Sequence, residues 1–85
     1  MKAILIRMSI RNGNIEVTTN HVVETKCKDI NFAAEWFVSH FFGYGLRGVS
    51  NDTWFFDYDS IACRVEKVQE IDNDTATLLK NLLYY

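Results

Sequence analysis

Residues 3–21 constrain the fold most, because an alternating apolar pattern runs into a hairpin turn and out again. Four large apolar residues alternate with the positions between them: Ile4, Ile6, Met8 and Ile10. Asn12-Gly13 follows, and this dipeptide is a strong hairpin signal because a type I′ turn needs positive φ at both central residues. A turn at that point pairs four residues with four: Ile10 with Ile15, Met8 with Val17, Ile6 with Thr19, and Ile4 with His21. Turn and pattern therefore predict one hairpin in one register.

Residues 29–43 predict a helix that follows the hairpin. Asp29 or Asn31 can cap its start, and the helix is expected to run to about Phe42, with Gly43 as a left-handed stop. A narrow polar stripe is formed by Asn31, Glu35 and Ser39. Apolar and aromatic residues cover the opposite side: Ala33, Trp36, Phe37, His40 and Phe41. We therefore expect a largely buried helix; an exposed one would itself be a candidate binding surface.

Residues 49–83 predict a second hairpin and a second helix. With the turn at 57–60, Phe56 faces Ile61 and Trp54 faces Cys63. The alternation then slips, because Val65, Val68 and Ile71 cannot share one face of a regular strand, which predicts a bulge near Glu66-Lys67. A capped helix should begin between Asp72 and Asp74, with one leucine-rich side: Leu78, Leu79, Leu82 and Leu83.

The elements add up to one small α+β domain over residues 1–85. The predicted order is ββ-α-ββ-α, in two layers, with an antiparallel sheet of about four strands and both helices on one face. Eighty-five residues leave no room for a second core. The hydrophobic content of 48% is too high for a disordered chain.

The stretch GYGLRG, at 43–48, fits the spacing G-x-G-x-x-G of dinucleotide-binding loops. Such a loop must follow a strand and open a helix, so that phosphate meets the helix N-terminus. Here the glycines follow a helix and precede a strand. We therefore interpret Gly43 as a helix stop and Gly45 and Gly48 as turn residues.

The remaining reactive residue types form no catalytic pattern. His21 and His40 are both expected to point into the core, as hydrogen-bonded core histidines, with a pH-responsive pair or half of a metal site as the alternatives. Cys63 is predicted to be buried, and Cys27, between two lysines and just before a helix, is where a thiolate could be stabilised. Neither cysteine shows metal-ligand spacing. We expect no enzyme activity, no metal and no cofactor.

Compartment follows from what the sequence lacks. The opening residues do not read as a signal peptide, because Arg7 interrupts the apolar run and no small-residue cleavage site follows. Nothing approaches the roughly 20 apolar residues of a membrane span. Together with cysteines expected to be reduced, this predicts a cytoplasmic protein without membrane contact.

Charge is distributed unevenly along the chain. The formal net charge of −2 argues against a general binder of phosphate backbones, and nucleic acid is therefore not the expected partner. Residues 50–76 carry seven acidic residues against two basic ones, a net −5, whereas the rest of the chain is net +3. Aromatic residues accompany these acids. This combination favours a protein partner with a basic patch.

The leading functional hypothesis is a non-catalytic protein-binding or inhibitory module, either monomer or homodimer. Its predicted contact residues are Asp52, Phe55, Asp57, Tyr58, Asp59, Glu70, Asp72 and Asp74. The alternative is a small nucleic-acid-binding accessory domain that uses six basic positions: Lys2, Arg7, Arg11, Lys26, Lys28 and Arg47. In size and lack of catalytic signature the chain resembles small accessory proteins of phages and mobile elements. That resemblance implies inhibition of a host nucleic-acid-binding system, and it rests on no motif.

Overall fold

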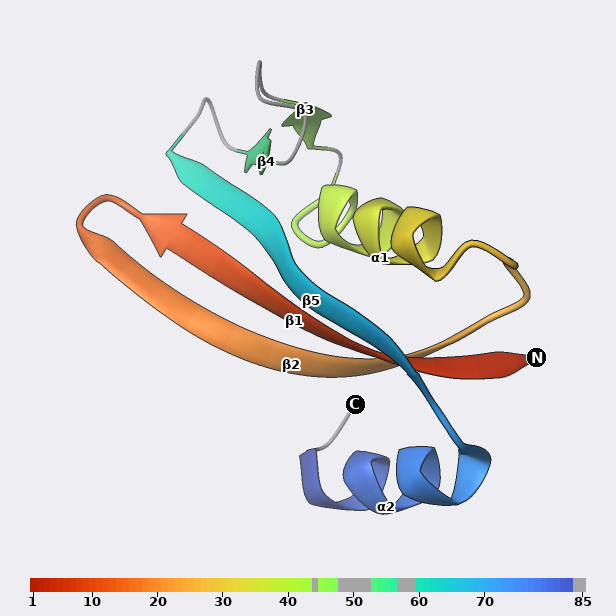
Figure 1. The fold of residues 1–85 in the computed structure, drawn as a ribbon. Helices are drawn as coiled ribbons and strands as arrows, with labels where there is room; N and C mark the ends of the chain where they lie inside the picture. The colour runs from red at the N-terminus through yellow and green to blue at the C-terminus, as the bar shows by residue number, and fades with distance from the viewer. Residues whose placement is uncertain (44, 48–52, 57–59, 84–85) are drawn as a thin grey trace.

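The computed structural model of the chain describes residues 1–43, 45–47, 53–56 and 60–83 (Figure 1). Its elements are β1 (Lys2–Asn12), β2 (Ile15–Thr25), α1 (Ile30–Ser39), β3 (Leu46–Arg47), β4 (Thr53–Phe56), β5 (Ile61–Ile71) and α2 (Asn73–Leu83). Within these ranges the strands form one antiparallel sheet in the order β2-β1-β5-β4-β3. The predicted α+β class and the order ββ-α-ββ-α are confirmed, with the two-residue strand β3 as an addition.

The N-terminal hairpin forms, but its register differs from the predicted one by two residues. Asn12 pairs with Ile15, so the loop consists of Gly13 and Asn14, and Ile6 faces His21. Gly13 has φ 64° and takes the first loop position, where both primed turn types demand positive φ. Asn12 therefore stays in the strand. Because the shift is an even number of residues, each side chain keeps its predicted face.

The bulge predicted in the last strand is confirmed. The register between β1 and β5 shifts between Arg7 and Met8, and Glu66 is passed over in the pairing. The extra residue brings Val65 and Val68 to the same side of the sheet, where both pack against the main core. The predicted pairing of β4 with β5 is also confirmed, because Trp54 lies opposite Cys63.

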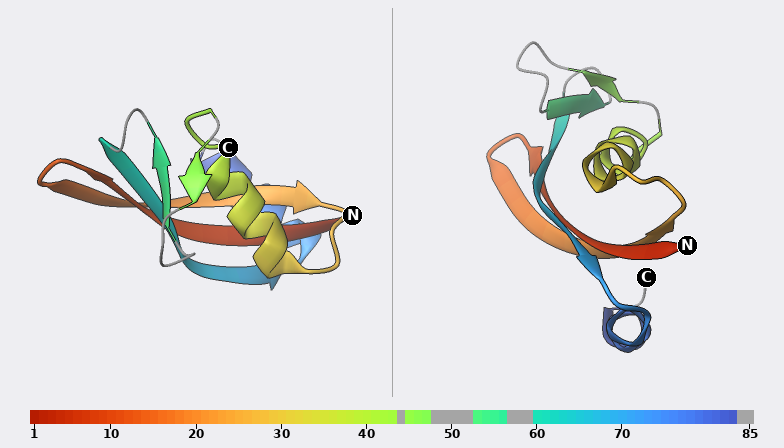
Figure 2. Two further views of the ribbon diagram at one scale, coloured as in Figure 1. Left: turned by 90° about the horizontal axis from the view of Figure 1, so that it is seen from above. Right: turned by 45° about the vertical axis from the view of Figure 1, so that its right-hand side comes forward.

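The two helices lie on opposite faces of the sheet, which Figures 1 and 2 show from different sides. The main core joins α1 to one face and contains Ile4, Ile6, Met8, Ala34, Val38, Trp54, Phe56 and Cys63. A smaller core joins α2 to the other face and contains Ala3, Val22 and Ala76, with Leu5, Ile71 and Leu79 packed against it. The expectation that both helices share one face is wrong, because β1 is apolar on both sides at its N-terminal end. At that end α2 adds a further layer.

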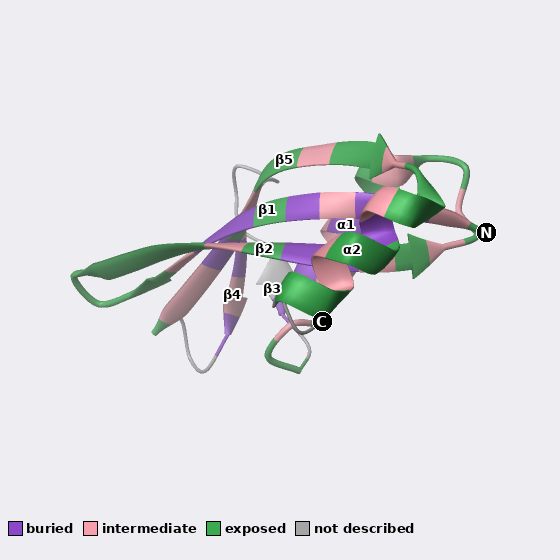
Figure 3. Ribbon diagram, turned by 90° about the horizontal axis from the view of Figure 1, so that it is seen from below, coloured by how far each residue is buried: buried purple, intermediate pink, exposed green. Residues whose placement is uncertain are grey.

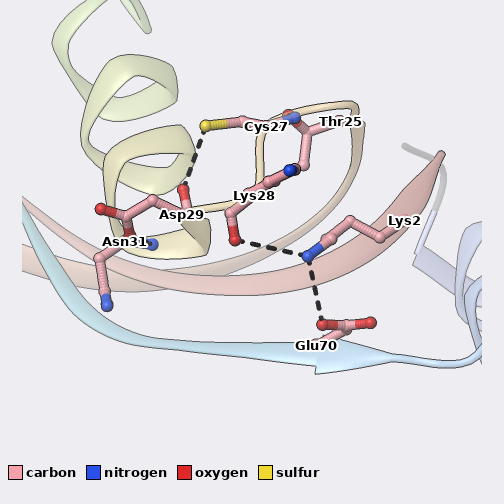
Figure 4. A network of polar contacts seen from close by, with 7 residues as sticks. All are labelled: Lys2, Thr25, Cys27, Lys28, Asp29, Asn31 and Glu70. Atoms are coloured by element: carbon pink, nitrogen blue, oxygen red, sulfur yellow. Dashed lines mark hydrogen bonds and ion pairs between the residues drawn. The ribbon is translucent and has the colours of Figure 1, made fainter.

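Asp29 caps the start of α1, as one of the two predicted candidates. Its side-chain oxygen accepts hydrogen bonds from the backbone N–H groups of Asn31, at 3.0 Å, and Phe32, at 3.3 Å. Just before the cap, the Cys27 thiol donates to the Asp29 carbonyl oxygen at 3.3 Å (Figure 4). The two bonds to the Asp29 side chain satisfy backbone donors that a helix start leaves open.

The end of α1 differs from the prediction. The helix stops at Ser39, short of Phe42, and Gly43 has φ 95° in the turn that follows. Gly45 is buried, and its N–H donates to the Ser39 carbonyl oxygen at 2.7 Å. A Cβ at Gly45 would lie 2.6 Å from the Phe56 ring, so glycine here permits a close approach of the chain to the core.

Helix α2 is capped as predicted but buries less of its surface. The Asp72 side chain accepts a hydrogen bond from the Thr75 backbone N–H at 2.6 Å, and this bond lowers the pKa of the Asp72 carboxyl. Ala76 is buried against the sheet. Two of the leucines predicted to face the sheet are exposed, Leu78 to 59% and Leu82 to 61%. The predicted leucine side is therefore only partly correct.

We expect Gly13→Val to destabilise the domain by about 1–2 kcal/mol, the cost of placing an L-residue in the left-handed region. A Cβ at this position meets nothing within 4 Å, so the loss comes from the backbone alone. Urea denaturation measures it, with Gly13→Asn as the control, because asparagine tolerates positive φ. Equal stability of the valine variant and the parent would contradict this account of the turn.

Candidate protein-binding surface

The outward side of α1 carries two exposed aromatic rings. Phe32 is 57% exposed and Trp36 is 58% exposed, and residues four apart lie on one face of a helix. Ala34 and Val38 are the helix residues buried against the sheet. The prediction that Trp36 is buried is therefore wrong. The helix carries more apolar residues than its contact with the sheet can cover, and the buried side is centred on the smaller ones.

His40 lies on this outward side and supports the Trp36 ring. The two rings are stacked, with centroids 4.3 Å apart. The His40 Nδ1 lies 2.9 Å from the Trp36 carbonyl oxygen and 2.8 Å from the Ser39 hydroxyl oxygen. His40 is exposed, so the prediction that it points into the core beside His21 is wrong. We call Phe32, Trp36 and His40 the aromatic face of α1.

A groove runs between the aromatic face and the end of β2. It has a volume of about 330 Å³ and is lined by Val23, Glu24, Thr25, Cys27, Phe32, Ala33, Trp36 and Phe37. Most of these side chains are apolar. The Glu24 side chain lies on the other face of the sheet, where its carboxylate accepts a hydrogen bond from the Lys80 ammonium of α2 at 2.6 Å, and this contact lowers the pKa of the Glu24 carboxyl. A mainly apolar cleft of this kind is typical of a site that takes an apolar side chain.

The contact residues predicted from the sequence do not form one patch within the described residues. Four of the eight lie outside the described ranges: Asp52, Asp57, Tyr58 and Asp59. Tyr44 and Gly48, from the stretch GYGLRG at 43–48, also lie outside these ranges. Phe55 lies opposite Ala62, near the start of β5. Glu70 lies near the end of the same strand, and Asp72 and Asp74 follow it. At about 3.3 Å per residue, roughly 25 Å of β5 separates Phe55 from Glu70.

The three acidic residues at the far end of β5 share that end of the sheet with the start of α1. The Lys2 ammonium connects the two elements, because it lies 3.7 Å from the Glu70 carboxylate and 3.4 Å from the Lys28 carbonyl oxygen (Figure 4). Asp72 and Asp74 are exposed at the start of α2. Carboxylates from the predicted acidic segment therefore lie at the end of the molecule where α1 begins.

His21 is a buried core histidine, as predicted. It is 8% exposed, its Nε2 lies 2.8 Å from the Thr19 hydroxyl oxygen, and its ring packs between those of Phe37 and Phe41, at 5.3 and 5.0 Å. Burial lowers the pKa of the His21 imidazole, because the charged form loses hydration.

The cysteines form no disulfide with one another. Cys63 is fully buried, as predicted, and burial raises the pKa of its thiol to about 11. Cys27 is partly buried, and its thiol donates to the Asp29 carbonyl oxygen. Among the described residues, no group of three or more histidine, cysteine or acidic side chains is placed to hold a metal ion. No helix in the described ranges is both long and apolar enough to cross a membrane.

Comparison with family models, with curated proteins and with solved structures finds no match to this chain. Function must therefore be inferred from the residues themselves. The aromatic face and its groove are the features that sequence reasoning missed. The signal available in the sequence was Phe32, which lies four residues before Trp36 and widens the apolar part of α1 beyond one side.

Two neighbouring aromatic residues of α1 should respond differently to truncation. Phe37 packs against the main core and against the rings of His21 and Phe41, so Phe37→Ala should lower the free energy of unfolding by about 3 kcal/mol. Trp36 is mostly exposed, so Trp36→Ala should cost less than about 1 kcal/mol. Urea denaturation of both variants measures the difference, and equal large losses would show that Trp36 is buried.

Burial of His21 predicts a pH dependence of stability. Its folded pKa is below the ordinary value of 6.5, so the unfolded chain takes up a proton more readily, and the free energy of unfolding should fall as pH drops from 7 to 5. His21→Leu should flatten this part of the profile. A parent profile that is flat between these pH values would contradict the prediction.

Proposed function

We propose that this chain is a non-catalytic protein-binding module whose main contact is the aromatic face of α1 with its adjoining groove. The single observation that supports this most is the exposure of Phe32 and Trp36, at 57% and 58%, beside an apolar groove. Two large rings on one helix face are costly to leave in water, and aromatic side chains near the centre of an interface contribute most of its binding energy. The proposed contact is thus the aromatic face of α1, whereas the contact predicted from the sequence was the acidic segment.

The chemistry of the surface favours a partner that combines an apolar anchor with basic residues. Helix α1 carries Glu35 and no lysine or arginine, and Asp29 caps its start. Glu70 and Asp74 add carboxylates at the same end of the molecule. An arginine or lysine of the partner can stack on Trp36 while a carboxylate lies nearby, and an apolar side chain of the partner can enter the groove.

A module of this kind would act in the cell as an inhibitor of its partner. A basic patch on a protein is often the place where it holds a phosphate backbone. A module that covers such a patch with aromatic and acidic side chains would compete with the nucleic acid for it. The expected inhibitory role on a nucleic-acid-binding protein therefore needs the same surface and no catalytic group.

The experiment compares two double variants that each remove two exposed apolar side chains from a helix. Phe32→Ala/Trp36→Ala alters the aromatic face, and Leu78→Ala/Leu82→Ala is the matched control on α2. Proteins retained from an extract of the native host by the immobilised parent are identified and purified. Calorimetry should then show at least a tenfold loss of affinity for the α1 variant, by the usual weight of interface aromatics, and none for the control.

A third variant tests the charge part of the proposal. Glu70→Lys/Asp74→Lys should slow association with the purified partner and reduce its dependence on salt, because rim charges act mainly on the encounter rate. Dissociation should stay nearly constant. A partner that binds the α1 variant as tightly as the parent, or that is lost with the α2 control instead, would refute the aromatic face as the contact.

A further inference from the structure

Helix α2 covers only one end of its face of the sheet, and the other end is open. Figure 3 views this face, with α2 over one end of the strands and the hairpin turn projecting at the other. The smaller core under α2 stops at Leu5 and Val22. Beyond it the strand pairing places a set of side chains on this open face: Arg7, Ser9, Arg11, Glu16, Thr18, Asn20, Thr53, Phe55, Ala62, Arg64 and Lys67.

The charges on this open face are mainly positive. Arg7 and Arg11 come from β1, and Arg64 and Lys67 come from β5, which is the neighbouring strand. We call these four residues the cationic face. Two carboxylates accompany them within the described residues: Glu16, 3.9 Å from the Arg11 guanidinium, and Glu66, 2.8 Å from that of Arg64. The Arg64 guanidinium donates two hydrogen bonds to one Glu66 carboxylate oxygen, at 2.8 and 3.2 Å. Both contacts are solvent-exposed pairs, a class that contributes little to stability.

Two shallow hollows lie between these cations. One, of about 170 Å³, is lined by Ser9, Arg11, Glu16, Thr53, Phe55, Ala62, Cys63 and Arg64. The other, of about 60 Å³, is lined by Leu5, Arg7, Asn20, Lys67 and Gln69. Each hollow therefore has a cation from β1 and a cation from β5. The larger hollow is also lined by the partly buried Phe55, by Thr53 and by the buried Ser9.

We propose that the cationic face binds single-stranded nucleic acid along β1 and β5. Phosphates lie against the four cations, and a base stacks on Phe55 while the Thr53 hydroxyl on the same strand meets its polar edge. This combination of an aromatic platform with a positive track is the general chemistry by which proteins hold single strands. An acidic protein segment would use the cations but gives no role to Phe55.

Only two of the four cations, Arg7 and Arg11, are among the six basic positions picked out from the sequence. Lys2, Lys26 and Lys28 lie at the opposite end of the sheet, near the start of α1. Arg64 and Lys67 belong to the acidic segment 50–76, in which acidic residues outnumber basic ones by seven to two. The net charge argued against nucleic acid, but pairing of β1 with β5 brings the positive residues of both segments onto one face.

The experiment measures fluorescence anisotropy of a labelled single-stranded 12-nucleotide probe of mixed sequence over a salt series. For four phosphate contacts, log K should fall with log salt with a slope of about −3, at roughly −0.7 per contact. Arg7→Gln/Arg11→Gln should reduce the slope to about −1.4 by the same rule. The matched control Lys26→Gln/Lys28→Gln, which removes equal charge at the other end of the sheet, should leave the slope unchanged.

Phe55→Leu separates nucleic acid from other polyanions. Loss of the ring should weaken binding about tenfold, the weight of one stacked base, at an unchanged salt slope. The proposal is overturned if the probe does not bind at low salt, or if a duplex of the same sequence binds more tightly. It is overturned as well if Arg7→Gln/Arg11→Gln and Lys26→Gln/Lys28→Gln give equal salt slopes. It is also overturned if poly-glutamate binds as tightly and ignores Phe55→Leu. Phe32→Ala/Trp36→Ala should retain probe binding, so this test and that of the aromatic face fail separately.

Discussion

Strand β1 is the part of the structure on which everything else depends. It is hydrogen-bonded to β2 on one edge and to β5 on the other, and its N-terminal half is covered on both faces. Ile4, Ile6 and Met8 face α1, and Ala3 faces α2. One strand thus supplies side chains to two cores, and each helix is held in place by alternate residues of the same short segment. Where β1 becomes polar on one face, at Arg7, the smaller core ends and the open face of the sheet begins.

Much of the fold follows from local sequence rules, and the misses have physical causes. The hairpin, the bulge at Glu66 and the caps at Asp29 and Asp72 were predictable, because each depends on a few neighbouring residues. The two-residue register error came from placing Asn12 in the turn, when Gly13 can supply the first positive φ itself. The position of α2 on the second face was not predicted, although Ala3 and Leu5 are apolar there.

The candidate surfaces were harder to predict than the fold. Periodicity in α1 marks a side rich in large residues, but the sheet accepts the side centred on Ala34 and Val38, so Trp36 remains in solvent. Small residues let the helix approach the sheet closely, and this packing outweighs the size of the rings left outside. The cationic face required knowledge of which strands pair, because Arg7 and Lys67 are 60 positions apart in the chain. Charge counted along the chain does not show this.

Pairing of β1 with β5 also sets an order in which the domain can assemble. The hairpin is complete at Thr25, but the strand that covers its other edge begins at Ile61. The interval must close as a loop, and the entropy of that closure is lost before the main core is formed. Until then, Ile4, Ile6 and Met8 are without the strand beside them. The rate of folding should therefore depend on how fast β5, late in the chain, pairs with β1, near its start. The hairpin of β1 and β2 provides the edge to which β5 pairs.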